Sequence, residues 1–475
     1  MSTEPATVSA PTAASYSRAL VWITLALVLL ADALDLIDST VTTVAAPTIA
    51  RDIGGGELLI KWLGASYALA LGALLVVGGR LGDRYGQRRL FLIGIAGFTL
   101  ASLACGLTAT PALLIVARAV QGGFGAFLIP QGMAIMVRTF PRSALKTAFN
   151  VFGPLLGLAS VGGPVLAGLI ISANIAGLGW RPIFLINVVL GTVGFVVALL
   201  LLPKVEADRT VRIDGLAAAT LIVAIFALIL GLTDGPSTGW DGWSIPEVGI
   251  GVVFFGLFVQ RQRSSVDPLL KPALFRNRGF VFGLIIGLVF FAVTTGLLYV
   301  VSLYMQDTLG ADALHAALTL LPMMFGLIIA SFVSGALMER LGRWLVAIGF
   351  MLSIIGAAWL LILILGQGAA TSLWELSPPV FIMGLGMGAG FGTIFNFALG
   401  DVADDEAGSA SGSMEAVQQL ASGIGAALVT SLYFNVATPG SPQAMVFTIG
   451  VVLALTIVCL PLVALLPREA RAEER

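Results

Sequence analysis

The stretch GGRLGDRYGQRR, residues Gly78 to Arg89, lies between two long apolar segments and decides how the chain is organised. It holds a single acid, Asp83, among four arginines. Arginine side chains do not cross a lipid bilayer without a large free-energy penalty, and glycines allow two helix ends to approach closely. We therefore expect a tight cytoplasmic turn between two membrane-spanning helices.

A weaker copy of this stretch, GALMERLGRW, occupies Gly335 to Trp344, so the two copies lie 256 residues apart (335 − 79). The residues that recur at the same spacing are Gly79, Leu81, Arg84 and Gly86, matched by Gly335, Leu337, Arg340 and Gly342. A parallel repeat over this distance indicates a duplicated unit, which is typical of membrane transporters.

The composition restricts the class of protein. Of 475 residues, 58% are hydrophobic and only 11% are charged, which is enough for a dozen or more spans of about 20 residues. The net charge is −1 and long basic blocks are lacking, so the sequence gives no electrostatic reason to expect nucleic-acid binding. Cys105 and Cys459 lie in apolar segments without a Cys-x-x-Cys motif, so we expect no disulfide, no metal site and no cofactor.

Apolar runs bounded by glycine, proline and charged residues predict fourteen transmembrane helices. They cover residues 19–46, 58–79, 90–109, 112–136, 145–171, 183–202, 213–233, 245–260, 280–304, 314–336, 344–366, 378–400, 407–432 and 443–466. We therefore expect an all-α polytopic membrane protein. When the loops are assigned alternately, 21 of the 25 lysines and arginines fall on one side, and this bias places both termini in the cytoplasm.

The repeat also predicts the domain organisation. The first stretch follows helix 2, so a duplication of six plus six helices would place the second stretch after helix 8. It follows helix 10 instead, so two helices have been inserted between two pseudo-symmetric six-helix bundles. The expected divisions are a disordered cytoplasmic N-terminus at 1–18, a bundle at 19–202, a linker with an inserted hairpin at 203–278, a bundle at 279–466 and a cytoplasmic tail at 467–475. We expect the hairpin, residues 213–260, to lie at the periphery of any central cavity.

The first predicted helix carries three acids, Asp32, Asp35 and Asp38, whose spacing of three places them within an arc of roughly 120 degrees. A charged side chain inside a membrane needs a partner or a function. Arg118 reaches a depth close to that of Asp38, so the two form either a static buried pair or part of a network that rearranges with protonation. Asp32 and Asp35 have no basic partner in a neighbouring span, and we expect them to carry protons.

Glu415 adds an acid to the thirteenth predicted helix, and Gln418 follows one turn later. Glu415 is either a further proton-coupling residue or a carboxylate near a helix start that reaches water and is favoured by the helix dipole. A metal site is not expected, because no cluster of histidine and acidic residues occurs.

The first stretch resembles the loop between helices 2 and 3 of the major facilitator superfamily, G-x-L-a-D-r-x-G-r-r. Fourteen spans resemble its drug:proton antiporter branch, and DSTVTTVAAP, Asp38 to Pro47, is similar to the D-x-T-x-x-N-x-A-L-P of that branch. LIVARAVQGGFGA resembles the R-x-x-Q-G motif through Arg118, Gln121 and Gly122. ASVGGPVLAG keeps Gly163, Pro164 and Gly168 of the antiporter motif but has alanine at 159 and 167.

The resemblance implies a proton-coupled antiporter that exports lipophilic, often cationic, small molecules across the cytoplasmic membrane by alternating access. It implies no enzymatic activity, and a monomer whose partners are drugs, protons and the lipid bilayer. The gate motif would comprise Gly79, Asp83, Arg84, Gly86 and Arg88. The substrate cavity would be lined by Gln121, Tyr299, Tyr304, Met387, Phe391 and Gln418.

Two alternatives remain open from the sequence. The same fold would serve a dedicated exporter of one endogenous metabolite, such as an antibiotic, a siderophore or an amino acid. A non-transporting membrane sensor belongs to another class, and it would have no need of unpaired acids in the middle of the membrane.

Overall fold

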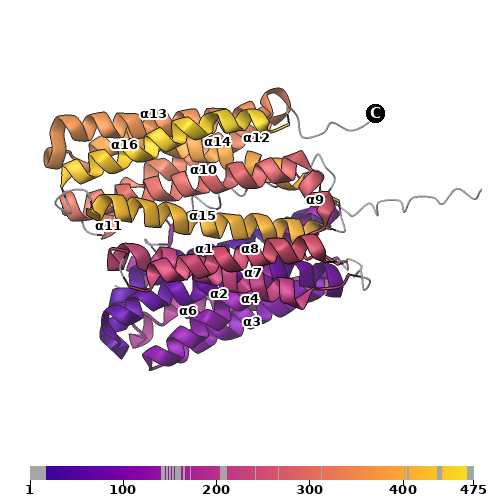
Figure 1. Ribbon diagram of the computed structural model, residues 1–475. Coiled ribbons are helices and arrows are strands. Elements are labelled where there is room, and N and C mark those ends of the chain that lie inside the picture. Colours follow the sequence, from indigo (N-terminus) through magenta and orange to yellow (C-terminus); the bar gives the residue numbers. More distant parts are fainter. Residues whose placement is uncertain are drawn as a thin grey trace, which may run out of the picture.

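The computed structural model describes residues 18–140, 173–203, 211–240, 242–265, 267–311, 313–400, 402–403, 406–435 and 441–467, with isolated positions between 145 and 171. Within these ranges every regular element is a helix, and the long helices run side by side (Figure 1). The predicted all-α membrane fold is therefore confirmed.

The first half of the chain forms one group of long helices. They are α1 (Arg18–Ile53), α2 (Gly56–Tyr85), α3 (Gln87–Leu107), α4 (Pro111–Thr139) and α6 (Pro182–Leu201), with a short turn η1 (Ile175–Gly177) before α6. α4 packs between α2 and α3, and α1 packs on α2, α4 and α6. Proline at the first positions of α4 and α6 starts both helices without the loss of a backbone hydrogen bond.

The second half forms a corresponding group. Its long helices are α10 (Arg278–Leu303), α12 (Leu321–Leu341), α13 (Trp344–Gln367), α14 (Ser377–Leu399), α15 (Ala407–Asn435) and α16 (Pro442–Cys459). Short elements join them: η2 (Tyr304–Thr308), α11 (Ala313–Thr319), η3 (Gly368–Ala370), η4 (Leu373–Leu376) and η6 (Leu460–Leu465). α14 packs between α12 and α13, as α4 does between α2 and α3. The span predicted at 314–336 is divided, because α11 ends before α12 begins.

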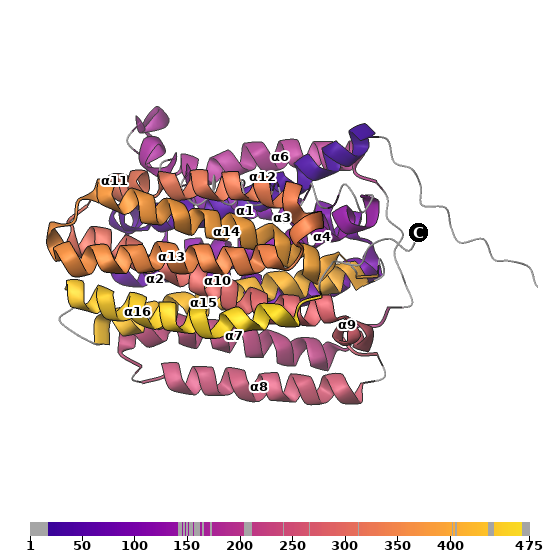
Figure 2. The ribbon, with the colours of Figure 1, turned by 90° about the horizontal axis from the view of Figure 1, so that it is seen from above.

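Along the chain, the two groups are separated by a hairpin of α7 (Gly215–Thr238) and α8 (Ser244–Ser264), followed by the short α9 (Pro272–Arg276). α8 is the outermost helix on its side of the molecule (Figure 2). α7 packs against α2 of the first group and α15 of the second. The hairpin is therefore peripheral as an element, but its inner helix covers the line along which α2 meets α15.

Twelve helices are long and apolar enough to cross a membrane, counted over the described residues. Most of the predicted segment 145–171 lies outside the part of the chain that the structure describes. α15 is not among the twelve, although it packs against α2, α4, α7 and α10 in the centre of the molecule. A helix that is surrounded by protein does not need the hydropathy of one that faces lipid.

The stretch expected to form a loop is mostly helical. α2 continues to Tyr85 and α3 begins at Gln87, so the turn consists of Gly86 alone, with φ of 94°. Gly342, 256 residues further on (342 − 86), separates α12 from α13 with φ of 49°. Positive φ is readily adopted by glycine, which explains why both copies of the repeat turn at this position.

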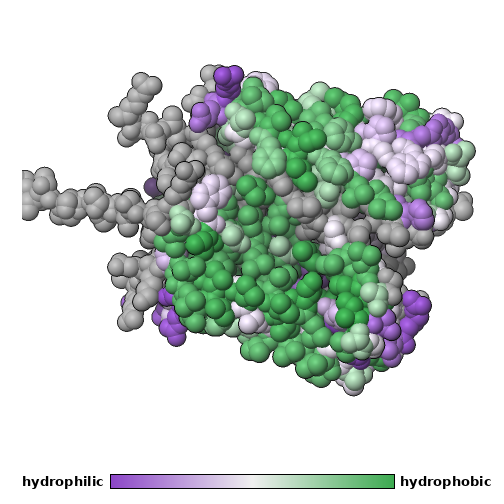
Figure 3. All heavy atoms as spheres, turned by 180° about the vertical axis from the view of Figure 1, so that it is seen from behind, coloured by the Kyte–Doolittle hydropathy of each residue, from purple (hydrophilic) through white to green (hydrophobic). Residues whose placement is uncertain are grey.

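We call the end of the molecule at which Gly86 and Gly342 lie the basic end. Both ends of the described chain lie there: Arg18 begins α1, and Arg343 donates hydrogen bonds to the carbonyl oxygens of Ala464 (2.8 Å) and Leu466 (3.0 Å). Hydrophobic side chains form a broad belt between polar ends on the face seen in Figure 3.

At the basic end a single apolar cluster joins the two groups of helices. Leu25 and Met133 of the first group belong to the same cluster as Phe290, Phe391 and Met414 of the second. At the opposite end the described residues form separate clusters, one around Trp180 and Phe184 and another around Tyr304 and Tyr433. The two groups are thus packed together at the basic end.

Candidate functional site

The three acids of α1 are all buried, as the helical spacing predicts for one face turned away from lipid. The exposed fractions are 8% for Asp32, 8% for Asp35 and 1% for Asp38. Each has different neighbours, and these differences separate their roles.

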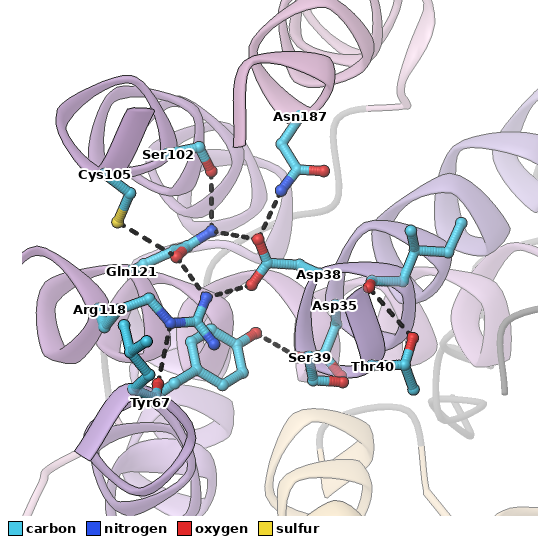
Figure 4. A network of polar contacts seen from close by, with 12 residues as sticks. Asp35, Asp38, Ser39, Thr40, Tyr67, Ser102, Cys105, Arg118, Gln121 and Asn187 are labelled. Atoms are coloured by element: carbon cyan, nitrogen blue, oxygen red, sulfur yellow. Dashed lines mark hydrogen bonds and ion pairs between the residues drawn. The ribbon is translucent and has the colours of Figure 1, made fainter. Parts of the chain in front are cut away.

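Asp38 is held by three side chains from two other helices (Figure 4). It forms an ion pair with Arg118 of α4, and it accepts hydrogen bonds from Gln121 Nε2 (3.0 Å) and Asn187 Nδ2 (2.6 Å). The predicted pair of Asp38 and Arg118 is confirmed. Because the carboxylate is paired and hydrogen-bonded, its burial as a charged group is compensated.

The surroundings of Arg118 fix its position as well. Its Nε donates to the carbonyl oxygen of Leu63 (3.1 Å), and its guanidinium lies 4.4 Å from the ring centre of Tyr67. Gln121 accepts from Arg118 Nη1 (2.7 Å) and donates to Ser102 Oγ (2.8 Å). These contacts tie α1, α2, α3, α4 and α6 together around one buried charge pair.

Asp35 has a partner that the sequence analysis missed. The hydroxyl of Tyr67 donates a hydrogen bond to Asp35 Oδ1, while the Tyr67 ring lies against Arg118. Tyr67 therefore connects Asp35 to the Asp38–Arg118 pair. Ser102 and Asn187 were also missed as partners.

Asp32 differs from the other two acids. Its Oδ2 is buried and accepts no hydrogen bond from any described residue. Asp35 and Glu415 are close enough for their charges to act on it, and Asp35 acts on Glu415 in turn. Glu415 belongs to α15 and is partly exposed, so acids from both groups of helices act on one another. The charge on this buried oxygen is therefore not compensated by a hydrogen bond from any described residue.

Asp83 of the gate motif lies at the junction of α2 and α15. It accepts hydrogen bonds from the backbone N–H groups of Gly408 and Ser409 (both 3.2 Å) and from Ser409 Oγ (2.9 Å). Arg138 of α4 lies 3.4 Å away, and Gln87 Nε2 donates at 3.1 Å. An acid from the first group thus caps the first turn of a helix in the second, where the dipole favours negative charge.

The other gate-motif residues take separate positions. A Cβ atom at Gly79 would lie 2.1 Å from the carbonyl oxygen of Gly408, so only glycine permits this approach of α2 to α15. Arg84 lies over the ring of Tyr85 (5.3 Å), and Arg88 donates to the carbonyl oxygen of Leu199 (2.6 Å). The cation that pairs with Asp83 is therefore Arg138, from outside the motif.

Three residues expected to line a substrate cavity are placed elsewhere. Tyr304 is fully buried, and its hydroxyl donates to the carbonyl oxygen of Gly368 (2.6 Å), so it is a packing residue. Gln121 is enclosed in the Asp38 network. Tyr299 lines a separate cavity beside the inserted helix α7. The sequence of an apolar helix does not distinguish a face that packs on protein from one that lines a cavity.

The remaining predicted cavity residues lie in the second group of helices. Phe391 stacks on Phe395 (5.0 Å between ring centres) and meets Phe291 edge to face (5.2 Å) within the apolar cluster of the basic end. Met387 and Gln418 are half-buried. Aromatic and methionine side chains of this kind offer an adaptable apolar surface.

The antiporter motif is described only in part. A Cβ atom at Gly163 would lie 1.9 Å from Thr40 Oγ1, so Gly163 permits close contact with α1. Gly168 has open space beside it, and Pro164 lies outside the described residues. No group of three or more histidine, cysteine or acidic side chains that could hold a metal occurs in the part of the chain that the structure describes.

Comparison with known proteins identifies the family. The family profile described as Major Facilitator Superfamily matches residues 28–426. The chain belongs to this superfamily. It is 38% identical over 419 residues to the probable actinorhodin transporter of Streptomyces coelicolor, which covers 87% of this chain and 72% of the relative.

Other members of the superfamily are also similar. The tetracenomycin C resistance and export protein of Streptomyces glaucescens is 30% identical over 425 residues, covering 88% of this chain and 77% of that protein. The structure of the human organic anion transporter MFSD10 matches with a TM-score of 0.64 at 15% identity, over 94% of this chain and 98% of that one. The chain is thus a multi-pass membrane transporter of the major facilitator superfamily and not an enzyme.

Proposed function

We propose that the chain exports lipophilic small molecules, many of them cationic, across the cytoplasmic membrane in exchange for protons. The observation that carries the proposal is the buried Oδ2 of Asp32, which has no partner among the described residues, beside Asp35 and Glu415. A transporter that binds a proton in mid-membrane needs such a carboxyl group, whereas a membrane scaffold or sensor does not.

The distribution of charge supports an orientation. Most arginines and lysines of the described loops lie at the basic end, which the positive-inside bias assigns to the cytoplasm. The two groups of helices pack together at that end through the Phe391 cluster and the contact of Asp83 with Ser409. The conformation is then one in which the cytoplasmic side is closed, and its opposite is reached by rocking the two groups.

The acids divide into two roles. Asp38 is fixed by Arg118, Gln121 and Asn187, so it holds the first group together. Asp32 and Asp35 of the first group and Glu415 of the second, whose charges act on one another, carry the protons. When Asp32 and Glu415 are both charged they repel one another, so protonation of one favours the approach of α1 and α15.

The names of relatives support the substrate class. Multidrug resistance protein Stp of Mycobacterium tuberculosis is 31% identical over 405 residues, and the chain covers 73% of it. The aromatic cluster of Phe291, Phe391 and Phe395, from α10 and α14 of the second group, is suited to flat, lipophilic molecules.

The test is transport in proteoliposomes with an imposed pH gradient. The purified chain should concentrate a lipophilic dye on the side from which protons leave, and a protonophore should abolish the accumulation. Accumulation that is independent of the gradient would refute proton exchange, while no movement of any compound would point to a sensor.

A second candidate is a dedicated exporter of one endogenous metabolite. It is favoured by the names of two relatives, which refer to single compounds, actinorhodin and tetracenomycin C. A panel of unrelated dyes and antibiotics separates the two, because a dedicated exporter transports a single chemical series from the panel and a multidrug exporter transports several.

A further inference from the structure

The inserted helix α7 does not lie flush against α15 along its whole length. A cavity of about 560 Å³ lies between them in the half of the membrane away from the basic end, with α10 as its third wall. α7 contributes Leu232 and Pro236, and α15 contributes Gly423 and Ala426. The volume lies within the range of about 300 to 1,000 Å³ that is usual for small-molecule sites.

The cavity exists because the residues of α15 that line it are small. Gly423, Ala426, Ala427 and Thr430 follow one another at positions i, i+3, i+4 and i+7, so they form a single helix face. A Cβ atom at Gly423 would meet only the far end of the Leu232 side chain, at 4.0 Å. The helices are nonetheless held in place, because Ile229 packs tightly over Gly72 of α2, one turn closer to the basic end.

A side-chain contact bridges α7 and α15 at the end of the cavity away from the basic end. Trp240 follows α7, folds back over Gly235 and donates a hydrogen bond from its indole Nε1 to Ser431 Oγ (2.6 Å). Ser431 is the next residue after Thr430 of the lining. A phospholipid chain must continue to a head group at the membrane surface, and this contact obstructs that path, whereas a compact ring compound fits within the hydrocarbon region.

The lining sets the chemistry of the occupant. None of its residues is charged, and the hydroxyls of Thr233 and Thr430 already donate to carbonyl oxygens one turn back (2.8 and 2.7 Å). Their remaining lone pairs can accept a hydrogen bond, and the ring of Tyr299, of which 44% is exposed, offers an aromatic face. An ionic ligand would find no partner in this lining.

We propose that this cavity, which we call the hairpin site, binds a neutral lipophilic ring compound that enters from the bilayer. The site is distinct from the acids of α1 and gives the inserted hairpin a role of its own. It brings lipophilic compounds out of the membrane to α15, the helix that carries Glu415. Binding there does not require proton coupling, so it can be measured without transport.

The experiment uses benzophenone, a neutral two-ring compound that inserts into nearby C–H bonds on illumination, with the full chain in proteoliposomes. We expect labelled peptides from α7 and α15, and we expect excess anthracene to compete for this labelling. Gly423→Leu and Ala426→Leu fill the cavity and should each lower the competed labelling at least tenfold. Tyr299→Ala removes the aromatic face of a side chain that is 44% exposed, and it should weaken the labelling about two- to tenfold.

Gly256→Leu on the outer helix α8 is the matched control, because a side chain there points into open space. It should leave labelling of α7 and α15 unchanged. Labelling of these helices that anthracene does not reduce would show ordinary lipid exposure and overturn the proposal. So would a phospholipid that co-purifies with the native chain and is lost from Gly423→Leu, because an acyl chain would then be the occupant.

Discussion

Ser409, in the first turn of α15, donates two hydrogen bonds to Asp83 of α2, one from its backbone N–H (3.2 Å) and one from its hydroxyl (2.9 Å). Asp83 and Ser409 lie 326 positions apart in the chain and on opposite halves of the duplicated fold. This contact joins the two groups of helices at the basic end.

We therefore expect Asp83→Asn to keep the fold and substrate binding but to slow turnover. The amide retains one acceptor oxygen but loses the charge that favours a helix N-terminus, and hydrogen bonds to a charged group contribute about 1.5 to 3 kcal/mol. The equilibrium between the closed and the open basic end should therefore shift toward the open state by about tenfold or more. Initial rates of dye transport measure this, with Arg212→Gln as control, because the side chain of Arg212 is exposed and lies outside the gate motif. Equal rates for Asp83→Asn and the native chain would rule out the gate.

The buried pair of Asp38 and Arg118 leads to a prediction about stability. Asp38→Asn leaves a buried guanidinium without its counter-ion, which should destabilise the chain by about 3 to 5 kcal/mol. Arg118→Gln added to Asp38→Asn removes the uncompensated charge and should restore part of the loss. Thermal unfolding in detergent measures both variants. If the double variant is less stable than Asp38→Asn alone, the charge pair is not the reason for the loss.

Asp214 provides a test of the inserted hairpin that depends on pH. Burial raises the pKa of Asp214, but hydrogen bonds from Ala217 N–H, Ser265 and Arg261, together with the charge of Arg261, outweigh it and hold the pKa below 3.8. A lowered pKa contributes stability that is present above pH 3.8 and is lost as the pH falls through the folded-state value.

Asp214→Asn keeps a good N-cap for α7 but loses the ion pair with Arg261. Its unfolding temperature should therefore lie below that of the native chain near pH 7, and the difference should narrow as the pH approaches and passes below 4. A difference that stays constant with pH would show that the charge of Asp214 does not matter.

Sequence periodicity predicted much of the fold, because long apolar helices carry their own signal. It also predicted the ion pair of Asp38 and Arg118, since counting residues from the helix ends placed both charges at one depth. The partnership of Tyr67 with Asp35 could not be predicted in this way. Tyr67 lies in an apolar run, and only the packing of α1 on α2 brings its hydroxyl to the carboxylate.

The positions of the predicted cavity residues likewise depend on how the helices pack, which the sequence pattern does not show. Tyr299, near the end of α10, and Tyr304, at the start of η2, lie five residues apart. Yet Tyr299 lines the cavity beside α7, and the hydroxyl of Tyr304 donates to the carbonyl oxygen of Gly368. The position of α7 over the line where α2 meets α15 was equally hidden. The basic linkers on either side of the hairpin indicate that it is an insertion, but they do not indicate which helices it covers.

We propose that Asp32 or Asp35 carries the proton that drives export, and paired transport assays in proteoliposomes test this role most directly. Asp32→Asn and Asp35→Asn remove one ionisable group each and keep its size. At least one of them should still exchange labelled substrate across the membrane but should no longer concentrate it when a pH gradient is imposed. Full gradient-driven accumulation by both variants would contradict the account and transfer the role to Glu415.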